Sequence, residues 1–442
     1  MIAPILARRD AAGFWLAVIL TGIGTGLGAA ALTALLELVQ HTLWAGSGLD
    51  LLEAASEAPA QWHVIVLCGA GLVTGIGQLL LVRLASGNGI DITAAIWFRA
   101  GRLPTLRTLC TAVLSIVIVG MGASLGREGA PKQAGAVIGN LLSDRVRLSD
   151  DARRLLVASG AGAGMAAAYG VPLGGAIFAL EVLRGELALR FVIPALVTSL
   201  IATSVSWVFL PDAPTYQVPA YAGSLSCAAW ALIAGPIAAV VSVGYVRAVA
   251  WTDRHKPTGI WRLIVPVVTL TLLGAVSVVF PQLLGNGRDV AQLAFVGQVA
   301  PLLLLFLAVL KPAATLMCLA SGAPGGLFTP SLALGALLGG ALGYPWSLLW
   351  PGVPPGLFAL LGAGAVLGAT TQGPISTVVL MMELTGYARA FIVPLLVIVA
   401  IATLVARTIE PRSIYDARLT DQEAFERMRQ REPDAQDSNA PR

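Results

Sequence analysis

Charged side chains are scarce in this 442-residue chain, since Asp, Glu, Lys and Arg make up only 12% of it while hydrophobic residues make up 57%. A soluble globular domain carries about 25% charged residues. The deficit excludes an ordinary soluble domain and indicates a polytopic membrane protein. The net charge of only +4 gives no reason to expect a nucleic-acid partner. We expect membrane lipid to surround the chain.

Cysteine and histidine are also rare, with four Cys and three His in the whole chain. Each cysteine stands alone in or near an apolar stretch, which is typical of a small hydrophobic side chain rather than of a disulfide or metal ligand. The histidines are widely separated and show no metal-ligand spacing. We therefore expect no metal and no cofactor.

Patterns typical of enzymes are lacking as well. An intramembrane protease needs a serine beside a histidine, paired aspartates in spanning helices, or His-Glu-x-x-His. Asp91 and Asp289 are the nearest candidates, and they lie in matched glycine turns. Residues 160–164 (GAGAG) superficially resemble a dinucleotide fingerprint, but the βαβ context that such a motif requires is missing. We expect a protein that is not an enzyme.

Long apolar stretches, by contrast, are frequent. Five are long enough to cross a bilayer, at about residues 14–38, 64–84, 228–248, 263–280 and 302–319. Others are too short, or too broken by glycine, to cross on their own. The first stretch is long and follows Arg8, Arg9 and Asp10, so we expect no cleavable signal.

Basic residues concentrate in short loops and at the ends, as in Arg8 and Arg9 and in segments 99–107 and 145–154. The positive-inside rule makes these segments candidates for the cytoplasmic face. We expect a multi-pass protein of a bacterial-type inner membrane.

Short patterns recur in the same order and at nearly constant spacing in the two halves of the chain. GNGID at 87–91 is matched by GNGRD at 285–289, GAVIG at 135–139 by GALLG at 335–339, and GAG at 160–162 by GAG at 362–364. Pro172 and Glu181 then match Pro374 and Glu383. The chain therefore divides into a first membrane repeat (1–215), a second membrane repeat (216–410) and a short polar cytoplasmic tail (411–442).

Glycine breaks at 86–90, 126–131 and 325–330 interrupt apolar segments of both repeats. Transporters use such breaks to place half-helix ends near the bilayer midplane, where free N–H groups attract anions. Glu128 lies in the second break, before a proline that suits a helix start. We expect its carboxylate to compete with an anion for this place and to leave when protonated.

These motifs together resemble the signature elements of the CLC family of chloride channels and chloride/proton antiporters. The resemblance rests on GREG at 126–129, GAPG at 322–325, GLFTP at 326–330, residues 172–181, and SIY at 413–415. It covers residues 12–418 and is strongest to short prokaryotic members without cytoplasmic regulatory domains.

The resemblance implies an all-α integral membrane protein with the CLC-type inverted-repeat fold, broken helices, and a homodimer with one pore per subunit. It also implies that Glu128 is the gate. The implied anion-binding residues are the following: Asn88 and Gly89 of the first break, Leu327 and Phe328 through their N–H groups, and Tyr415 through its hydroxyl.

Two departures from the family pattern affect function. The first break reads Gly-Asn-Gly-Ile-Asp where the family usually has Gly-Ser-Gly-Ile-Pro, so Asn88 offers an amide in place of a hydroxyl. Antiporters of the family usually carry an internal proton-transfer glutamate at the position of Val182. Valine cannot hold a proton, and channels of the family also have valine there.

We interpret the chain as a chloride transporter of the CLC type and favour slow chloride/proton antiport. One alternative is a passive chloride channel, which Val182 favours. Another is a fluoride-selective exporter, because fluoride-exporting members also depart from the serine at the position of Asn88. The substrates are then chloride or a similar small anion and, for antiport, protons.

Four polar residues near these motifs have structural explanations that we prefer. Arg127 is expected to hold its loop rather than to act with the gate, and Asn286 to shape a turn. Glu181 and Glu383 occupy equivalent repeat positions, which indicates a shared packing or capping role.

Overall fold

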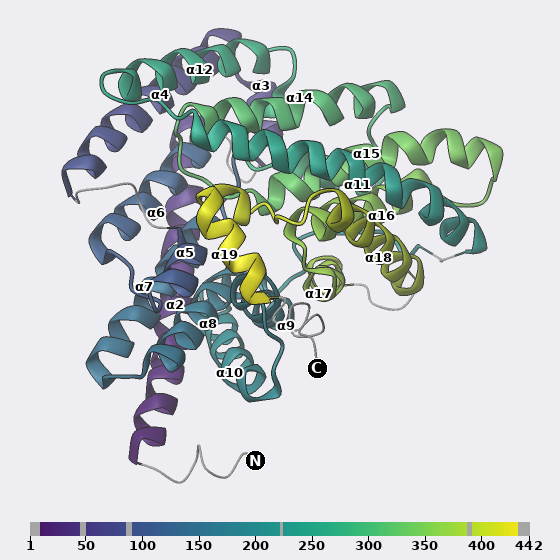
Figure 1. The fold of residues 1–442 in the computed structure, drawn as a ribbon. Helices are drawn as coiled ribbons and strands as arrows, with labels where there is room; N and C mark the ends of the chain where they lie inside the picture. The colour runs from purple at the N-terminus through teal and green to yellow at the C-terminus, as the bar shows by residue number, and fades with distance from the viewer. Residues whose placement is uncertain (1–8, 45–49, 85–90, 222–223, 387–390, 432–442) are drawn as a thin grey trace.

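The computed structural model describes residues 9–44, 50–84, 91–221, 224–386 and 391–431, and the regular secondary structure of these residues is helical (Figure 1). In the first repeat the helices are α2 (Arg9–Trp44), α3 (Leu51–Glu57), α4 (Ala60–Leu84), α5 (Ile92–Phe98), α6 (Thr105–Gly120), α7 (Gly129–Val146), α8 (Asp150–Tyr169), α9 (Pro172–Phe178), the π-helix η1 (Ala179–Arg184) and α10 (Leu189–Ser206).

The remaining helices are α11 (Leu225–Arg254), α12 (Trp261–Ser277), η2 (Pro281–Leu283), α13 (Arg288–Phe295), α14 (Pro301–Ala320), α15 (Phe328–Leu349), α16 (Pro355–Thr371), α17 (Pro374–Thr385), α18 (Ile392–Ile409), η3 (Asp416–Arg418) and α19 (Asp421–Arg431). The predicted all-helical membrane fold is confirmed. The repeat boundaries at residues 215 and 410 stay predictions.

Seven of the described helices are long and apolar enough to cross a membrane: α2, α4, α10, α11, α14, α15 and α18. Four of the five predicted spans fall in this set. The fifth is α12, which has only 17 residues and packs along α4, where a Cβ on Gly71 would lie 2.5 Å from Val267 Cα. The prediction missed α10, α15 and α18. Glycines at 335, 339, 340 and 343 interrupt α15, whereas α10 and α18 contain no glycine and are largely apolar over their whole length.

The matched glycines of the two repeats make equivalent close contacts. A Cβ on Gly135 would lie 1.9 Å from the carbonyl oxygen of Gly160, and one on Gly335 would lie 2.4 Å from that of Gly362. Each pair therefore lets two helices touch backbone to backbone, α7 against α8 and α15 against α16. This contact explains why GAVIG and GALLG recur, and it places two tightly packed helix pairs at the core of the fold.

Each of the matched glutamates, Glu181 and Glu383, caps a helix of the other repeat. Glu181 accepts from the N–H groups of Ile375 at 3.1 Å and Ser376 at 2.6 Å, at the start of α17. Glu383 accepts from those of Leu173 at 3.0 Å and Gly174 at 2.6 Å, at the start of α9. The predicted capping role of both residues is confirmed.

The two basic segments that the structure describes, 99–107 and 145–154, lie at one end of the molecule. Arg102 contacts Asp150 at 3.0 Å, which joins the two basic loops. A Cβ on Gly13 would lie 2.8 Å from Val146, so the start of α2 lies at the same end. This arrangement agrees with a common, cytoplasmic side for these two segments and the start of α2.

The tail contains the expected short helix, α19, which crosses the front of the view in Figure 1. It is not a loose appendage, because Arg427 is only 1% exposed. Its guanidinium pairs with Asp416 and donates to the carbonyl of Val182 at 2.6 Å. The tail is thus locked onto η1, at the same end as the basic loops.

Candidate anion site

The two glycine turns that precede α7 and α15 lie against each other. Gly126 N–H donates to the Gly326 carbonyl, and Gly326 N–H returns a bond to the Gly126 carbonyl, each at 2.8 Å. A Cβ would lie 2.2 Å from Glu128 Oε1 at Gly126 and 2.1 Å from it at Gly326. Both positions must therefore be glycine for the Glu128 side chain to fit beside the start of α15.

The Glu128 carboxylate is fully buried and binds the first turn of α15. Oε1 accepts from the Phe328 N–H at 2.7 Å. Oε2 accepts from the Thr329 hydroxyl at 3.2 Å and from the Tyr169 hydroxyl at 3.4 Å. The unsatisfied N–H groups and the dipole of a helix N-terminus favour negative charge. The carboxylate therefore lies where a small anion would find the same donors.

Aromatic rings connect this site to Tyr415. Tyr169 lies 6.3 Å from Phe328 between ring centroids, Phe328 lies 6.4 Å from Phe178, and Phe178 lies 5.7 Å from Tyr415. Of the ligands predicted from sequence, the structure thus brings Phe328 and Tyr415 to one apolar wall. Leu327 is buried and immediately precedes α15.

Sequence reasoning missed three residues at this site: Tyr169, Thr329 and Lys132. Tyr169 and Thr329 flank the Glu128 carboxylate, and their hydroxyl oxygens lie 2.8 Å apart. Lys132 is 5% exposed, and its Nζ donates to the Tyr415 hydroxyl at 3.4 Å. The available signal was a lysine four residues after Glu128, in a segment otherwise rich in small residues.

Asn88 and Gly89 lie outside the described residues. The adjoining Asp91 caps α5, since its Oδ1 accepts from the Thr93 N–H at 2.8 Å. An aspartate therefore starts this helix where the family pattern has proline. Asn286, the repeat mate of Asn88, accepts from the Arg288 N–H at 3.0 Å, so its predicted turn role is confirmed.

Val182 lies in the π-helix η1 and is 1% exposed. Short π segments within helices often mark functional positions. The neighbouring Glu181 binds the start of α17 through both carboxylate oxygens. Position 182 therefore offers no carboxylate. The adjacent carboxylate, that of Glu181, caps α17.

Arg127 packs its guanidinium over the Tyr169 ring, 5.1 Å from the centroid. It also lines a polar cavity of about 230 Å³ together with Glu37, Asp50 and Arg288. The contact with Tyr169 fits the predicted structural role, because Tyr169 in turn holds Glu128. This polar cavity thus reaches Arg127, the residue next to Glu128 in the sequence.

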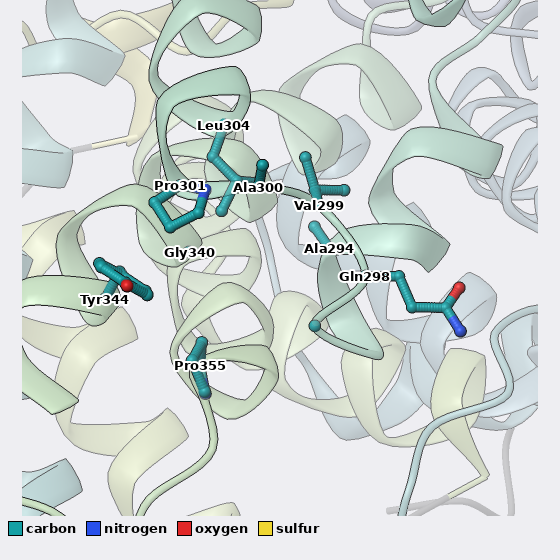
Figure 2. A pocket seen from close by; sticks show the side chains of 10 residues that line it. Ala294, Gln298, Val299, Ala300, Pro301, Leu304, Gly340, Tyr344 and Pro355 are labelled. Carbon is teal, nitrogen blue, oxygen red and sulfur yellow. The ribbon is translucent and has the colours of Figure 1, made fainter.

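A second cavity, of about 240 Å³, lies between α13, α14 and the ends of α15 and α16 (Figure 2). Its lining is mostly apolar, with Tyr344 and Gln298 at its edges in the figure. Of the predicted anion ligands, the three that the structure describes (Leu327, Phe328 and Tyr415) do not line it. It is separate from the Glu128 site.

Known proteins are similar to this chain in sequence. Residues 70–407 match the family model described as voltage gated chloride channel. The H(+)/Cl(-) exchange transporters ClcA of Salmonella arizonae and Salmonella newport are each 30% identical over 392 residues, which covers 84% of this chain and 81% of theirs.

Solved structures share the fold at lower identity. The crystal structure of a slow cyanobacterial Cl-/H+ antiporter superposes with a TM-score of 0.81 at 23% identity, covering 94% of this chain and 99% of that one. A CLC-type fluoride/proton antiporter gives a TM-score of 0.72 at 20% identity, with 93% and 99% covered. These similarities confirm the predicted inverted-repeat fold with broken helices.

Proposed function

This chain belongs to the voltage gated chloride channel family, and we propose that it exchanges chloride for protons across a bacterial inner membrane. The observation that carries the proposal is the Glu128 carboxylate on the Phe328 N–H. A carboxylate on anion-binding donors is a proton acceptor that competes with the transported anion.

We propose that Glu128 is the gate. In its charged form it occupies the donors of Phe328 and Thr329 and closes the path. Protonation removes the negative charge that these donors favour, so the side chain leaves and an anion takes its place. Each protonation of Glu128 is thereby linked to the entry of one anion.

We propose that the anion path is lined by the residues that the family resemblance indicates: Asn88, Gly89, Leu327, Phe328 and Tyr415. Their N–H, amide and hydroxyl groups are neutral donors suited to a small dehydrated anion. The aromatic wall from Phe328 through Phe178 to Tyr415 supports a continuous path.

The relatives favour proton exchange over the alternatives. ClcA proteins are named H(+)/Cl(-) exchange transporters. The alternative of a passive channel is supported only by Val182, and the alternative of a fluoride exporter only by Asn88. We propose that protons reach Glu128 from the cytoplasmic side through water rather than through a fixed relay, since Glu181 serves as a cap.

We further propose that the chain works as a homodimer with one pore per subunit and that it catalyses no covalent reaction. Cross-linking in the membrane, followed by mass determination of the purified complex, tests the dimer. A monomer that retains full transport activity would contradict it.

The test of the function is transport by the purified protein in liposomes. A chloride gradient should drive protons uphill, and Glu128→Gln should abolish this while leaving anion flux insensitive to pH. Val182→Glu should leave proton movement intact or increase it. Chloride flux without uphill proton movement at any pH, with the reversal potential of chloride alone, would show a passive channel instead.

A further inference from the structure

Two lysines are buried in this protein, and their surroundings differ. The Lys311 ammonium donates to the carbonyls of Leu283, Leu284 and Gly285 at 2.9, 3.0 and 2.9 Å. All three of its donors are used by backbone oxygens. Lys311 is thus a satisfied structural lysine that ties α14 to the turn before α13.

The ammonium of Lys132 has fewer hydrogen-bond partners than that of Lys311. In the described part of the chain its one hydrogen bond goes to the neutral hydroxyl of Tyr415, at 3.4 Å. Otherwise its Nζ faces aromatic rings, 4.8 Å from the Tyr415 centroid and 5.4 Å from that of Phe178. A buried ammonium in such surroundings is costly unless a negative charge accompanies it.

The nearby carboxylates act on Lys132 only from beyond ion-pair distance, so none of them is a direct partner. The ionisable groups that act on Lys132 are Glu128, Asp91, Arg418 and Tyr415. The Glu128 carboxylate is held by α15, and the Asp91 carboxylate caps α5. Among the described residues, no carboxylate lies within ion-pair distance of Lys132, and Arg418 adds positive charge.

Packing does not require a lysine at this position either. By the spacing that matches Gly126 to Gly326 and Gly135 to Gly335, the repeat mate of Lys132 is Leu332. Leu332 is 1% exposed in the first turns of α15. The same position in the second repeat is therefore filled by an apolar side chain, and the charge on Lys132 is an addition to the shared fold.

We propose that the Lys132 ammonium binds the transported anion directly, at a subsite between Phe328 and Tyr415, and that the anion is its counter-charge. The inference rests on the function proposed above and extends it. Because Tyr415 accepts from Lys132, its own O–H is left to donate to the same anion. The subsite then combines one charge-assisted and one neutral hydrogen bond.

Protonation of Glu128 changes the charge balance around Lys132. With Glu128 charged, the site holds one carboxylate and one ammonium. When Glu128 is protonated, Lys132 is left without a nearby free negative charge, and an entering anion restores the balance. Protonation of the gate and binding of the anion at Lys132 therefore favour each other.

The test is chloride binding by the full-length protein in detergent, measured by titration calorimetry and by the chloride-dependent rise in Tm. Lys132→Met should raise the chloride Kd by roughly 10- to 100-fold, the loss expected for a hydrogen bond to a charged group. Lys132→Gln should do the same. Lys132→Arg should stay within a few-fold of wild type. Leu332→Met, the repeat-mate control, should bind chloride as wild type does.

Each outcome decides the proposal. Unchanged chloride affinity in folded Lys132→Met and Lys132→Gln overturns it. Unchanged affinity together with lost uphill proton movement overturns it in favour of a lysine that carries the proton. Wild-type protein that neither binds nor transports chloride overturns both this inference and the proposed function, whereas failure of the inference alone leaves wild-type transport intact.

Discussion

The two repeats share their framework and differ in the side chains at the centre. In both, a glycine pair brings two helices into backbone contact, and a glutamate caps a helix of the other repeat. At the centre, Glu128 of the first repeat faces the N–H of its mate, Phe328. Lys132 of the first repeat likewise corresponds to the apolar Leu332 of the second.

Under the function proposed above, this division separates the residues that carry the fold from those that carry the transport. A symmetric framework brings two helix starts together, as the bridge between Gly126 and Gly326 shows. The side chains at these two starts then differ. The start of α15 donates its N–H groups, and the Glu128 carboxylate, from the start of α7, accepts from them. A titratable gate requires this asymmetry, because two equal helix starts would only attract the anion.

The largest effect should follow from releasing the tail, which holds η1 of the first repeat. The equivalent carbonyl of the second repeat, that of Leu384, accepts instead from the Tyr216 N–H at 2.9 Å. Arg427→Met leaves Asp416 buried and unpaired, so it should cost about 3–5 kcal/mol in the free energy of unfolding. Thermal unfolding in detergent measures this loss.

The control is the double variant Arg427→Met with Asp416→Asn. It removes the unpaired charge and should recover part of the loss. A single variant as stable as wild type would show that the tail merely rests on η1.

Next in size are the glycine contacts, for which the two repeats should behave alike. Gly135→Ala and Gly335→Ala force a Cβ against backbone oxygens and should each cost about 1–3 kcal/mol. Gly244→Ala is the control, because nothing lies within 4 Å of a Cβ there and alanine favours the helix. Yield of monodisperse protein and its Tm report the effect. A cost confined to one repeat would break the symmetry argued here.

The caps should have a smaller and equally symmetric effect. Glu181→Gln and Glu383→Gln lose the charge at a helix N-terminus, at about 1 kcal/mol each. Both variants should lower Tm by similar amounts, and Glu181→Gln should keep uphill proton movement in liposomes. Loss of that movement would instead make Glu181 part of the proton route.

The smallest effect concerns the end of α18, where Glu410 binds Arg412 at 2.7 Å and Arg247 at 3.0 Å. The hydrogen bond from Arg412, aided by Arg247 and opposed by burial, lowers the pKa of Glu410 to about 2. An unfolded glutamate has a pKa of about 4.3. The ion pairs therefore stabilise fully above about pH 4.3, and this stability is lost as the pH falls through about 2.

Comparing wild type with Glu410→Gln isolates this term. The difference in Tm should be constant from pH 7 to 5 and should shrink between pH 4 and 2. A difference that is independent of pH down to 2 would contradict the assignment.

Much of the fold could be predicted because its constraints are local and repeated. Composition identified the membrane, and the matched glycines and glutamates identified the repeats. The equivalence of Glu181 and Glu383 predicted a shared packing or capping role, and the structure shows that the role is capping. The span α15 was missed because four glycines interrupt it, whereas α10 and α18 are continuous, largely apolar stretches that the sequence does show.

The candidate site was predictable only where a motif carried it. Glu128 and Phe328 belong to such motifs, and the structure places them in contact. Tyr169 has no local signal, Thr329 lies in a motif that was assigned other ligands, and Lys132 is marked only by its spacing from Glu128; tertiary packing joins all three to the site. A lysine in a helix is ordinary in sequence, and only its burial beside Tyr415 makes it informative.

The central claim is that the Glu128 carboxylate occupies the place of an anion on the Phe328 N–H. Its most direct test is the structure of Glu128→Gln in bromide, with the anomalous signal compared with that of wild type. We expect a bromide ion within hydrogen-bond distance of the Phe328 N–H in the variant, with the substituted side chain displaced, and no bromide there in wild type with Glu128 charged. An undisplaced side chain without bromide in the variant, or bromide beside an unmoved Glu128 in wild type, would contradict the account.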